Sequence, residues 1–131
     1  MLAVPFMFEN LEVYQKAVDL AERVSVLTDG FPRGYGFLAD QLNRAALSIA
    51  ANLAEACPER SRRGNGRLTK ADRKNLFIVA RGSVHECVPV LEIARRRGLL
   101  NDASSTEMRG ELETIAKTIS GLIAGVDKRG R

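Results

Sequence analysis

The chain has 131 residues, of which 45% are hydrophobic and 27% are charged, and it contains four prolines and no tryptophan. This balance excludes a largely disordered chain, and the length suits one domain with an aliphatic core. The net charge of +4 and the pI of about 9.4 favour acidic partners such as nucleic acid or an anionic membrane surface. Two cysteines, Cys57 and Cys87, are too few for a disulfide framework, so a reducing compartment is expected.

The first eight residues, MLAVPFMF, are apolar but too short to cross a membrane. No basic segment precedes them, and Pro5 interrupts the run. Neither a signal peptide nor a membrane span is expected. The sequence therefore predicts a cytoplasmic protein without membrane attachment.

The first predicted helix covers residues 10–28, where apolar residues recur at intervals of three and four. The segment 29–36 follows it and is rich in glycine, which is typical of a turn. The apolar stripe of this helix is predicted to contain Leu11, Tyr14, Val18, Ala21 and Leu27.

The second predicted helix covers residues 37–55. Its apolar positions keep the helical period, and additional alanines beside them would let a neighbouring helix approach closely. The predicted stripe comprises Leu38, Leu42, Ala45, Ile49 and Leu53, widened by Ala46, Ala50 and Ala54.

The third predicted helix covers residues 69–97 and begins with Thr69 and Asp72, which have the spacing of a capping box. Pro89 lies inside the helical pattern and predicts a kink or a local break. Three arginines in the last turn suit the negative end of the helix dipole, and Gly98 suits the left-handed position after it. The apolar face is predicted to contain Leu76, Phe77, Ala80, Val84, Val88 and Leu91.

The fourth predicted helix covers residues 105–127 and has a second capping-box pattern, formed by Ser104 and Glu107. Its apolar positions again step by three and four, which indicates one buried face. They are Leu112, Ile115, Ile119, Leu122, Ile123 and Val126.

Four amphipathic helices with mostly short connections predict an all-α fold, an antiparallel up-down-up-down four-helix bundle that forms a single domain over residues 1–131. A three-helix arrangement and an extended helical hairpin stay open as alternatives. In the bundle, the connection between the second and third helices lies at the same end as the start of the first and the finish of the fourth.

This topology predicts a bundle that is basic at both ends. Lysines and arginines at helix ends contact phosphates without reading base sequence, and such binding weakens with salt, although charge runs at helix ends are also commonly solvated surface. The first candidate nucleic-acid-binding tip comprises Arg60, Arg62, Arg63, Arg67, Lys70, Arg73, Lys74, Lys128 and Arg129. The second basic tip comprises Arg33, Arg95, Arg96 and Arg97.

The sequence offers little chemistry for an active site. The glycines at 64–67 lack the Lys-Ser/Thr of a nucleotide-binding loop. His85 is the single histidine, and Cys87, two residues later on the same helix, points in another direction and is expected to be a small core residue. No catalytic residue, metal ligand or cofactor is predicted, and the chain is not expected to be an enzyme.

Two carboxylates remain as candidate members of buried ion pairs. Glu55 and Glu92 are expected either to pair with Arg44 or Arg81 or to be solvated surface charges.

Three segments, FENLEVYQKAVDLA, LADQLNRAALSIAANLAE and GNGRLTKADRKNLFIVARGSVHECVPVLEIARRRGLL, resemble the family of proteins encoded in intervening sequences of 23S ribosomal RNA genes. The likeness covers residues 8–100, and the fourth helix agrees in pattern alone. It implies a small cytosolic four-helix bundle without known catalytic residues, and a homo-oligomer, since some relatives form pentameric rings. The fold is also similar to that of accessory proteins of diversity-generating retroelements, which associate with a reverse transcriptase and nucleic acid.

The resemblance also implies an inserted loop. In the family the second helix usually ends in Ala-Glu-Gly followed shortly by a basic residue, whereas here ACPERSRR separates Ala54-Glu55 from Gly64. We therefore predict an insertion at residues 56–63, which a surface turn tolerates at little cost. Cys57 and three of the arginines then belong to the insertion and not to the sequence pattern that the family shares.

The sequence thus predicts a non-enzymatic oligomeric scaffold that touches RNA or DNA phosphates through its basic tips. The alternative is a structural or protein-binding module, for example a reverse-transcriptase accessory protein, without direct nucleic-acid contact. Subunit contacts are expected from the alanine-rich second helix, from surplus apolar positions, and from Val4, Phe6 and Phe8.

Overall fold

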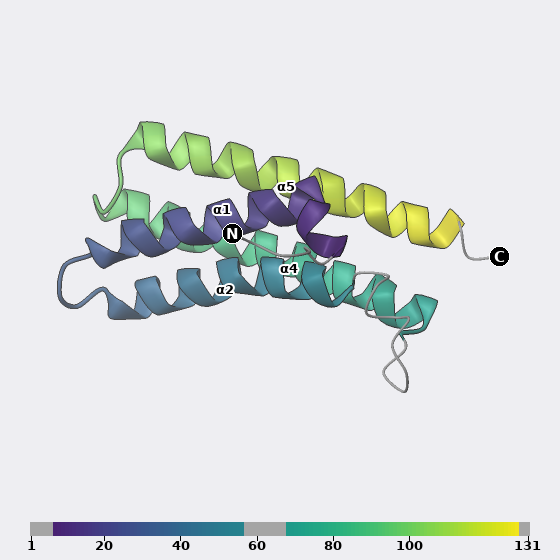
Figure 1. Ribbon diagram of the computed structural model, residues 1–131. Coiled ribbons are helices and arrows are strands. Elements are labelled where there is room, and N and C mark those ends of the chain that lie inside the picture. Colours follow the sequence, from purple (N-terminus) through teal and green to yellow (C-terminus); the bar gives the residue numbers. More distant parts are fainter. Residues whose placement is uncertain (1–6, 57–67, 129–131) are drawn as a thin grey trace, which may run out of the picture.

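The computed structural model shows an antiparallel bundle of four long helices (Figure 1). The structure describes residues 7–56 and 68–128, and within these ranges it contains no strand. The predicted all-α four-helix bundle is thereby confirmed. In chain order the elements are the 3₁₀ helix η1 (Met7–Asn10) and the helices α1 (Glu12–Asp29), α2 (Gly36–Glu55), α4 (Lys70–Arg96) and α5 (Asp102–Lys128).

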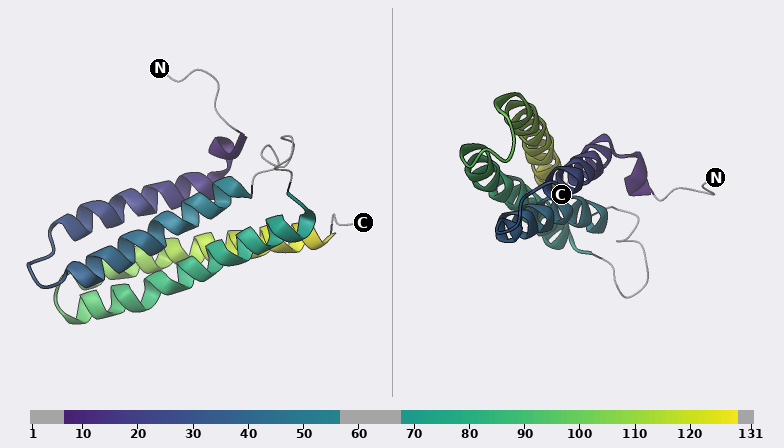
Figure 2. Two further views of the ribbon diagram at one scale, coloured as in Figure 1. Left: turned by 90° about the horizontal axis from the view of Figure 1, so that it is seen from below. Right: turned by 90° about the vertical axis from the view of Figure 1, so that its left-hand side faces the viewer.

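The helices alternate in direction, and each packs against its neighbour in the chain (Figures 1 and 2). The α1–α2 and α4–α5 connections lie together at one end of the bundle, which we call the turn end. The other end, where α2 finishes and α4 begins, is called the α2–α4 end. The ion pair between Lys74 Nζ and Asp127 Oδ1 (2.9 Å) joins the start of α4 to the finish of α5 there.

The buried stripe of α1 differs from the predicted one. Its buried residues are Val13, Ala17, Leu20, Val24 and Thr28. The predicted stripe lies beside them, with four of its members half-buried against the core and Val18 40% exposed. Apolar residues occupy more than one face of this helix. The periodicity therefore did not identify which of these faces packs against α2 and α5.

The other predicted stripes are largely confirmed. Most of their residues are buried, and Ala54, Leu76, Val88 and Leu122 are half-buried at the edges of the core. The most deeply buried large side chains from these helices are Leu42, Ile49, Leu53, Val84, Leu91, Leu112, Ile115 and Ile119.

The ends of α4 follow the sequence prediction. Thr69 Oγ1 accepts a hydrogen bond from the Asp72 N–H (2.9 Å), and Asp72 Oδ2 accepts one from the Thr69 N–H (3.1 Å), which completes the capping box. After the helix, Gly98 has a φ of 77°, and the Leu99 N–H donates to the Ala94 carbonyl (2.9 Å). This is the left-handed ending that the glycine predicted.

The predicted start of α5 is wrong by three residues. Asn101 caps this helix, because its Oδ1 accepts a hydrogen bond from the Ser104 N–H at 2.7 Å. Ser104 therefore lies inside the first turn instead of preceding it. Asparagine and serine are about equally good capping residues, so the spacing to Glu107 favoured the wrong one.

The helix α4 continues from Lys70 to Arg96, so there is no local break at Pro89, and the alternative, a kink, stays a prediction. Proline deprives the carbonyl four residues earlier, that of His85, of its helical hydrogen bond. His85 and Pro89 are both exposed at the outside of the bundle, where water can solvate that carbonyl.

The predicted insertion lies almost entirely outside the described residues, apart from its first member. Ala56 has no exposed surface, and its N–H donates to the Asn52 carbonyl at 3.1 Å. It therefore belongs to the packed end of α2, and a deletion that keeps this residue begins at residue 57.

Deleting residues 57–63 is expected to leave the melting temperature within a few degrees of that of the full chain. The deletion roughly halves the connection between α2 and α4, which changes the loop-closure free energy by only ~0.6 kcal/mol. Thermal and urea unfolding followed by circular dichroism measure the effect. As a positive control, Leu53→Ala removes a side chain without exposed surface and should cost about 2–5 kcal/mol; a comparable cost for the deletion would contradict the insertion.

Candidate nucleic-acid interface

The α2–α4 end gathers cationic side chains from two helices. Lys70, Arg73 and Lys74 lie in the first turns of α4, and Lys128 is the last residue of α5. The Lys74–Asp127 ion pair holds the two helix ends together. Lys70 and Lys128 are exposed, and neither forms an ion pair with a described residue, so their charges face solvent.

Arg73 is less available than its neighbours. It is half-buried, and its Nε is enclosed without a hydrogen-bond partner in the described part of the chain. Part of this guanidinium therefore faces inward. The remaining residues predicted for this tip lie outside the described ranges, and their contribution stays a prediction; they are Arg60, Arg62, Arg63, Arg67 and Arg129.

At the turn end, carboxylates neutralise two of the four predicted arginines. Glu92 accepts hydrogen bonds from Arg95 (Nη2, 2.8 Å) and Arg96 (Nε, 2.9 Å), and Arg95 also reaches Asp102 at 3.3 Å. The hydrogen bonds from Arg95, and then those from Arg96, lower the pKa of Glu92 to about 2. This group is therefore an ion-pair network within the chain.

This network corrects the predicted pairing of Glu92. Its partners are Arg95 and Arg96, one helical turn away on α4, instead of Arg44 or Arg81. Arg81 donates to Ser120 Oγ on α5 at 3.1 Å. The pairing predicted for Glu55 stays a prediction.

The other two arginines of the turn end, Arg33 and Arg97, are exposed and form no ion pair with a described residue. Arg97 lies against Tyr35, with its guanidinium carbon 5.5 Å from the ring centroid. Its Nη2 and Nε donate to the tyrosine hydroxyl at 2.9 and 3.3 Å. This contact brings the α1–α2 turn against the end of α4, and the sequence offered no signal for it beyond the predicted topology.

Ion pairs join α1 to α5. Arg23 of α1 forms ion pairs with Glu107 (2.9 Å) and with Glu111 of α5. The two glutamates are four residues apart and share one face of α5. The sequence therefore contained a signal for a cationic partner on this face, but not the identity of that partner.

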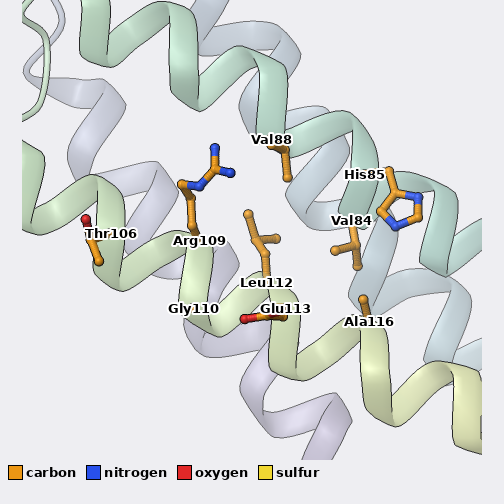
Figure 3. Close-up of a pocket in the computed structure, with 9 residues that line it drawn as sticks. All are labelled: Val84, His85, Val88, Thr106, Arg109, Gly110, Leu112, Glu113 and Ala116. Carbon is orange, nitrogen blue, oxygen red and sulfur yellow. The ribbon is translucent and has the colours of Figure 1, made fainter.

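A groove of about 510 Å³ lies between α4 and α5 (Figure 3). Its apolar lining includes Val88 and Leu112, and Figure 3 shows Arg109 reaching from α5 toward α4, with His85 near the other end. Among the described residues, no three His, Cys, Asp or Glu side chains are grouped so that they could hold a metal ion.

Cys87 is buried in the core, as predicted, and burial raises the pKa of its thiol to about 12. The thiol is therefore protonated at neutral pH and packs as a small apolar group. Cys57 lies outside the described residues. Within these residues, no helix has the length and hydropathy required to cross a membrane.

The fold is that of a small antiparallel four-helix bundle with exposed cations at both ends. The model of the 23S rRNA-intervening sequence protein family matches residues 9–121. The chain therefore belongs to this family, as the sequence resemblance predicted.

A solved structure supports the fold. It is a protein of unknown function from the S23 ribosomal protein family of Bacteroides thetaiotaomicron VPI-5482, and it superposes with a TM-score of 0.74 at 22% identity, covering 90% of this chain and 99% of that chain. At this identity the likeness concerns the fold alone. Comparison with curated proteins gives no match, and the likeness to retroelement accessory proteins stays a prediction.

The lowered pKa of Glu92 leads to a pH-dependent stability difference. A carboxylate whose pKa is lowered on folding, here from 4.5 to about 2, contributes stability above the unfolded value, and this contribution is lost as the pH falls toward 2. The difference in melting temperature between the wild type and Glu92→Gln should be largest near neutral pH and shrink below pH ~5. Glu113→Gln, at an exposed position, is the matched control, and a Glu92→Gln difference that stays constant with pH would contradict the network.

Proposed function

We propose that this chain is a non-enzymatic, self-associating helical bundle that contacts RNA or DNA phosphates through its α2–α4 end. The observation that carries the proposal is the convergence of Lys70 and Lys128, from the start of α4 and the finish of α5, beside the Lys74–Asp127 pair. Both ammonium groups are exposed. Ammonium groups clustered in this way suit phosphates, whose contacts position a nucleic acid without reading its sequence.

The α2–α4 end is favoured over the turn end because of how charge is distributed. At the turn end, Glu92 and Asp102 already occupy Arg95 and Arg96, and of the two arginines without an ion pair, Arg97 is held by the Tyr35 hydroxyl, which leaves Arg33. At the α2–α4 end, Asp127 occupies Lys74, while Lys70 and Lys128 have no ion-pair partner among the described residues. The arginines of the predicted insertion follow α2 directly and would add to the same end.

The alternative is a structural or protein-binding module, such as an accessory protein of a reverse transcriptase, in which these cations only keep the surface soluble. The family's name describes the genes that encode its members and assigns no ligand by itself. The dependence of RNA binding on charge at the α2–α4 end separates the two proposals.

Binding to a labelled structured RNA, followed by fluorescence anisotropy from about 50 to 300 mM KCl, should weaken linearly on a log–log plot. Lys70→Glu and Lys128→Glu should each weaken binding and lower the slope by roughly 0.7–0.9 for each phosphate that the protein no longer neutralises. Lys117→Glu makes the same charge change midway along α5, where it is exposed, and should have a smaller effect on the slope.

Replacing Arg60, Arg62, Arg63 and Arg67 together by Glu should abolish RNA binding. No binding by the wild type at low salt, or an equal weakening by Lys117→Glu, would contradict the phosphate-contact proposal. Either result would favour the protein-binding alternative.

Self-association is proposed through the outward faces of α2 and α4. The alanines Ala45, Ala46 and Ala50 are buried inside the single chain and have almost no surface left for a subunit contact. Leu47 of α2 and Val79 of α4 are instead 64% and 42% exposed. Phe8 packs edge-on against Tyr14 within the chain at a centroid distance of 5.0 Å, whereas Val4 and Phe6 lie outside the described residues.

Sedimentation velocity should show the wild type as one species heavier than the monomer, and the family resemblance implies a pentamer. Leu47→Glu and Val79→Glu should shift it toward the monomer, because each places a charge in a desolvated contact. Val26→Glu, at a 69% exposed position on α1, is the matched control. A monomeric wild type at all concentrations would overturn the self-association proposal.

A further inference from the structure

Phe37, in the first turn of α2, is a large aromatic side chain with no role in the core. It is 67% exposed, whereas the next residue, Leu38, is 4% exposed and packs inside. An exposed phenylalanine ring offers an apolar, flat surface to a partner. Its neighbours decide what kind of partner this surface suits.

The register between α2 and α4 places Phe37 close to the end of α4. Ser48 and Ser83 share a hydrogen bond of 2.8 Å between their hydroxyl groups, and the two helices are antiparallel. Phe37 and Ala94 are separated from their respective serines by the same number of residues in the direction of the turn end. The two residues therefore lie at the same height along the bundle axis. Along the bundle axis, Phe37 therefore lies within one helical turn of Arg97, which itself packs on Tyr35.

Two arginines near this ring are open to solvent, while Asp40, about one turn further along α2, adds an exposed carboxylate on the same side as Phe37. Arg97 donates to the Tyr35 hydroxyl but has no ion-pair partner among the described residues, and the same holds for Arg33. Gly34, between Arg33 and Tyr35, has a φ of 99°, a left-handed conformation that favours glycine and turns the chain toward α2. Glu92, the carboxylate of the network on α4, is already occupied by Arg95 and Arg96.

We propose that Phe37, Tyr35, Arg33 and Arg97 form a binding site for an unpaired nucleic-acid strand at the turn end. A base stacks on the Phe37 ring, and Arg33 and Arg97 contact the phosphates on either side of it. Exposed aromatic rings beside cations are how proteins hold single strands without reading sequence, because every base has a flat face. The site rests on the proposed nucleic-acid function but assigns it a second, chemically different location.

The site is tested with a labelled strand of about five nucleotides and a matched strand of the same length with abasic positions. The strand is short compared with α4, which is roughly 40 Å long, so it reports on one end of the bundle. Phe37→Leu should weaken binding of the intact strand roughly tenfold, and Phe37→Trp should retain or improve it. The abasic strand should bind more weakly and should not distinguish the wild type from Phe37→Leu.

The salt dependence separates the ring from the arginines. Phe37→Leu should leave the slope of log affinity against log salt unchanged, whereas Arg97→Gln should lower it by about 0.7, the value for one phosphate contact on a single strand. Val18→Ala is the control for removing an exposed apolar side chain elsewhere, on α1. Melting curves of Arg97→Gln check that removal of the Tyr35 contact leaves the bundle folded.

Equal binding of the intact strand by the wild type and Phe37→Leu would overturn the site. The site would also be overturned if Phe37→Leu weakened binding of the abasic strand as much as it weakened binding of the intact strand. A change in sedimentation without a change in strand binding would also overturn it, since the ring would then be a subunit contact. If structured RNA still depends on Lys70 and Lys128, such results reject this site alone. If neither RNA binds, the proposed function fails as well.

Discussion

The contact between α2 and α4 is the interaction on which the rest of the structure depends. Small residues line it, and the hydrogen bond between Ser48 and Ser83, a residue only 5% exposed, fixes the register of the two helices. A buried hydroxyl without a partner is costly, so a slip along this seam would break the bond and leave the buried Ser83 hydroxyl without this partner. This register sets Phe37 level with the end of α4.

Carboxylates then determine which cations are available to bind a ligand, because a cation in an ion pair within the chain is already occupied. Glu92 binds two arginines, Asp127 binds Lys74, and Arg23 closes the seam between α1 and α5 through two glutamates. Such pairs contribute modestly to stability when exposed. Their larger consequence is that the cations left without an ion-pair partner at the two ends of the bundle differ in character, lysines at one end and arginines at the other.

The two ends therefore suit different features of a nucleic acid. The α2–α4 end presents flexible lysines, which are compact charges suited to phosphates of any geometry. The turn end presents arginines, the exposed ring of Phe37 and the half-buried ring of Tyr35, an arrangement suited to an unpaired base and its phosphates. With α4 spanning the distance between them, one subunit has two separate surfaces whose contributions can be measured independently.

The sequence by itself determined the four helices, their alternating directions and the cap at Thr69, because periodicity and capping depend on residues within one or two turns of each other. It did not determine that Asn101 rather than Ser104 caps α5, or that Val18 faces solvent, since both alternatives satisfied the local pattern. Only the tertiary structure decided that Glu92 binds Arg95 and Arg96, that Arg97 meets Tyr35, and that Phe37 is exposed beside a buried Leu38. These features depend on which helix lies opposite each side chain and in what register, and that information comes from contacts between distant parts of the chain.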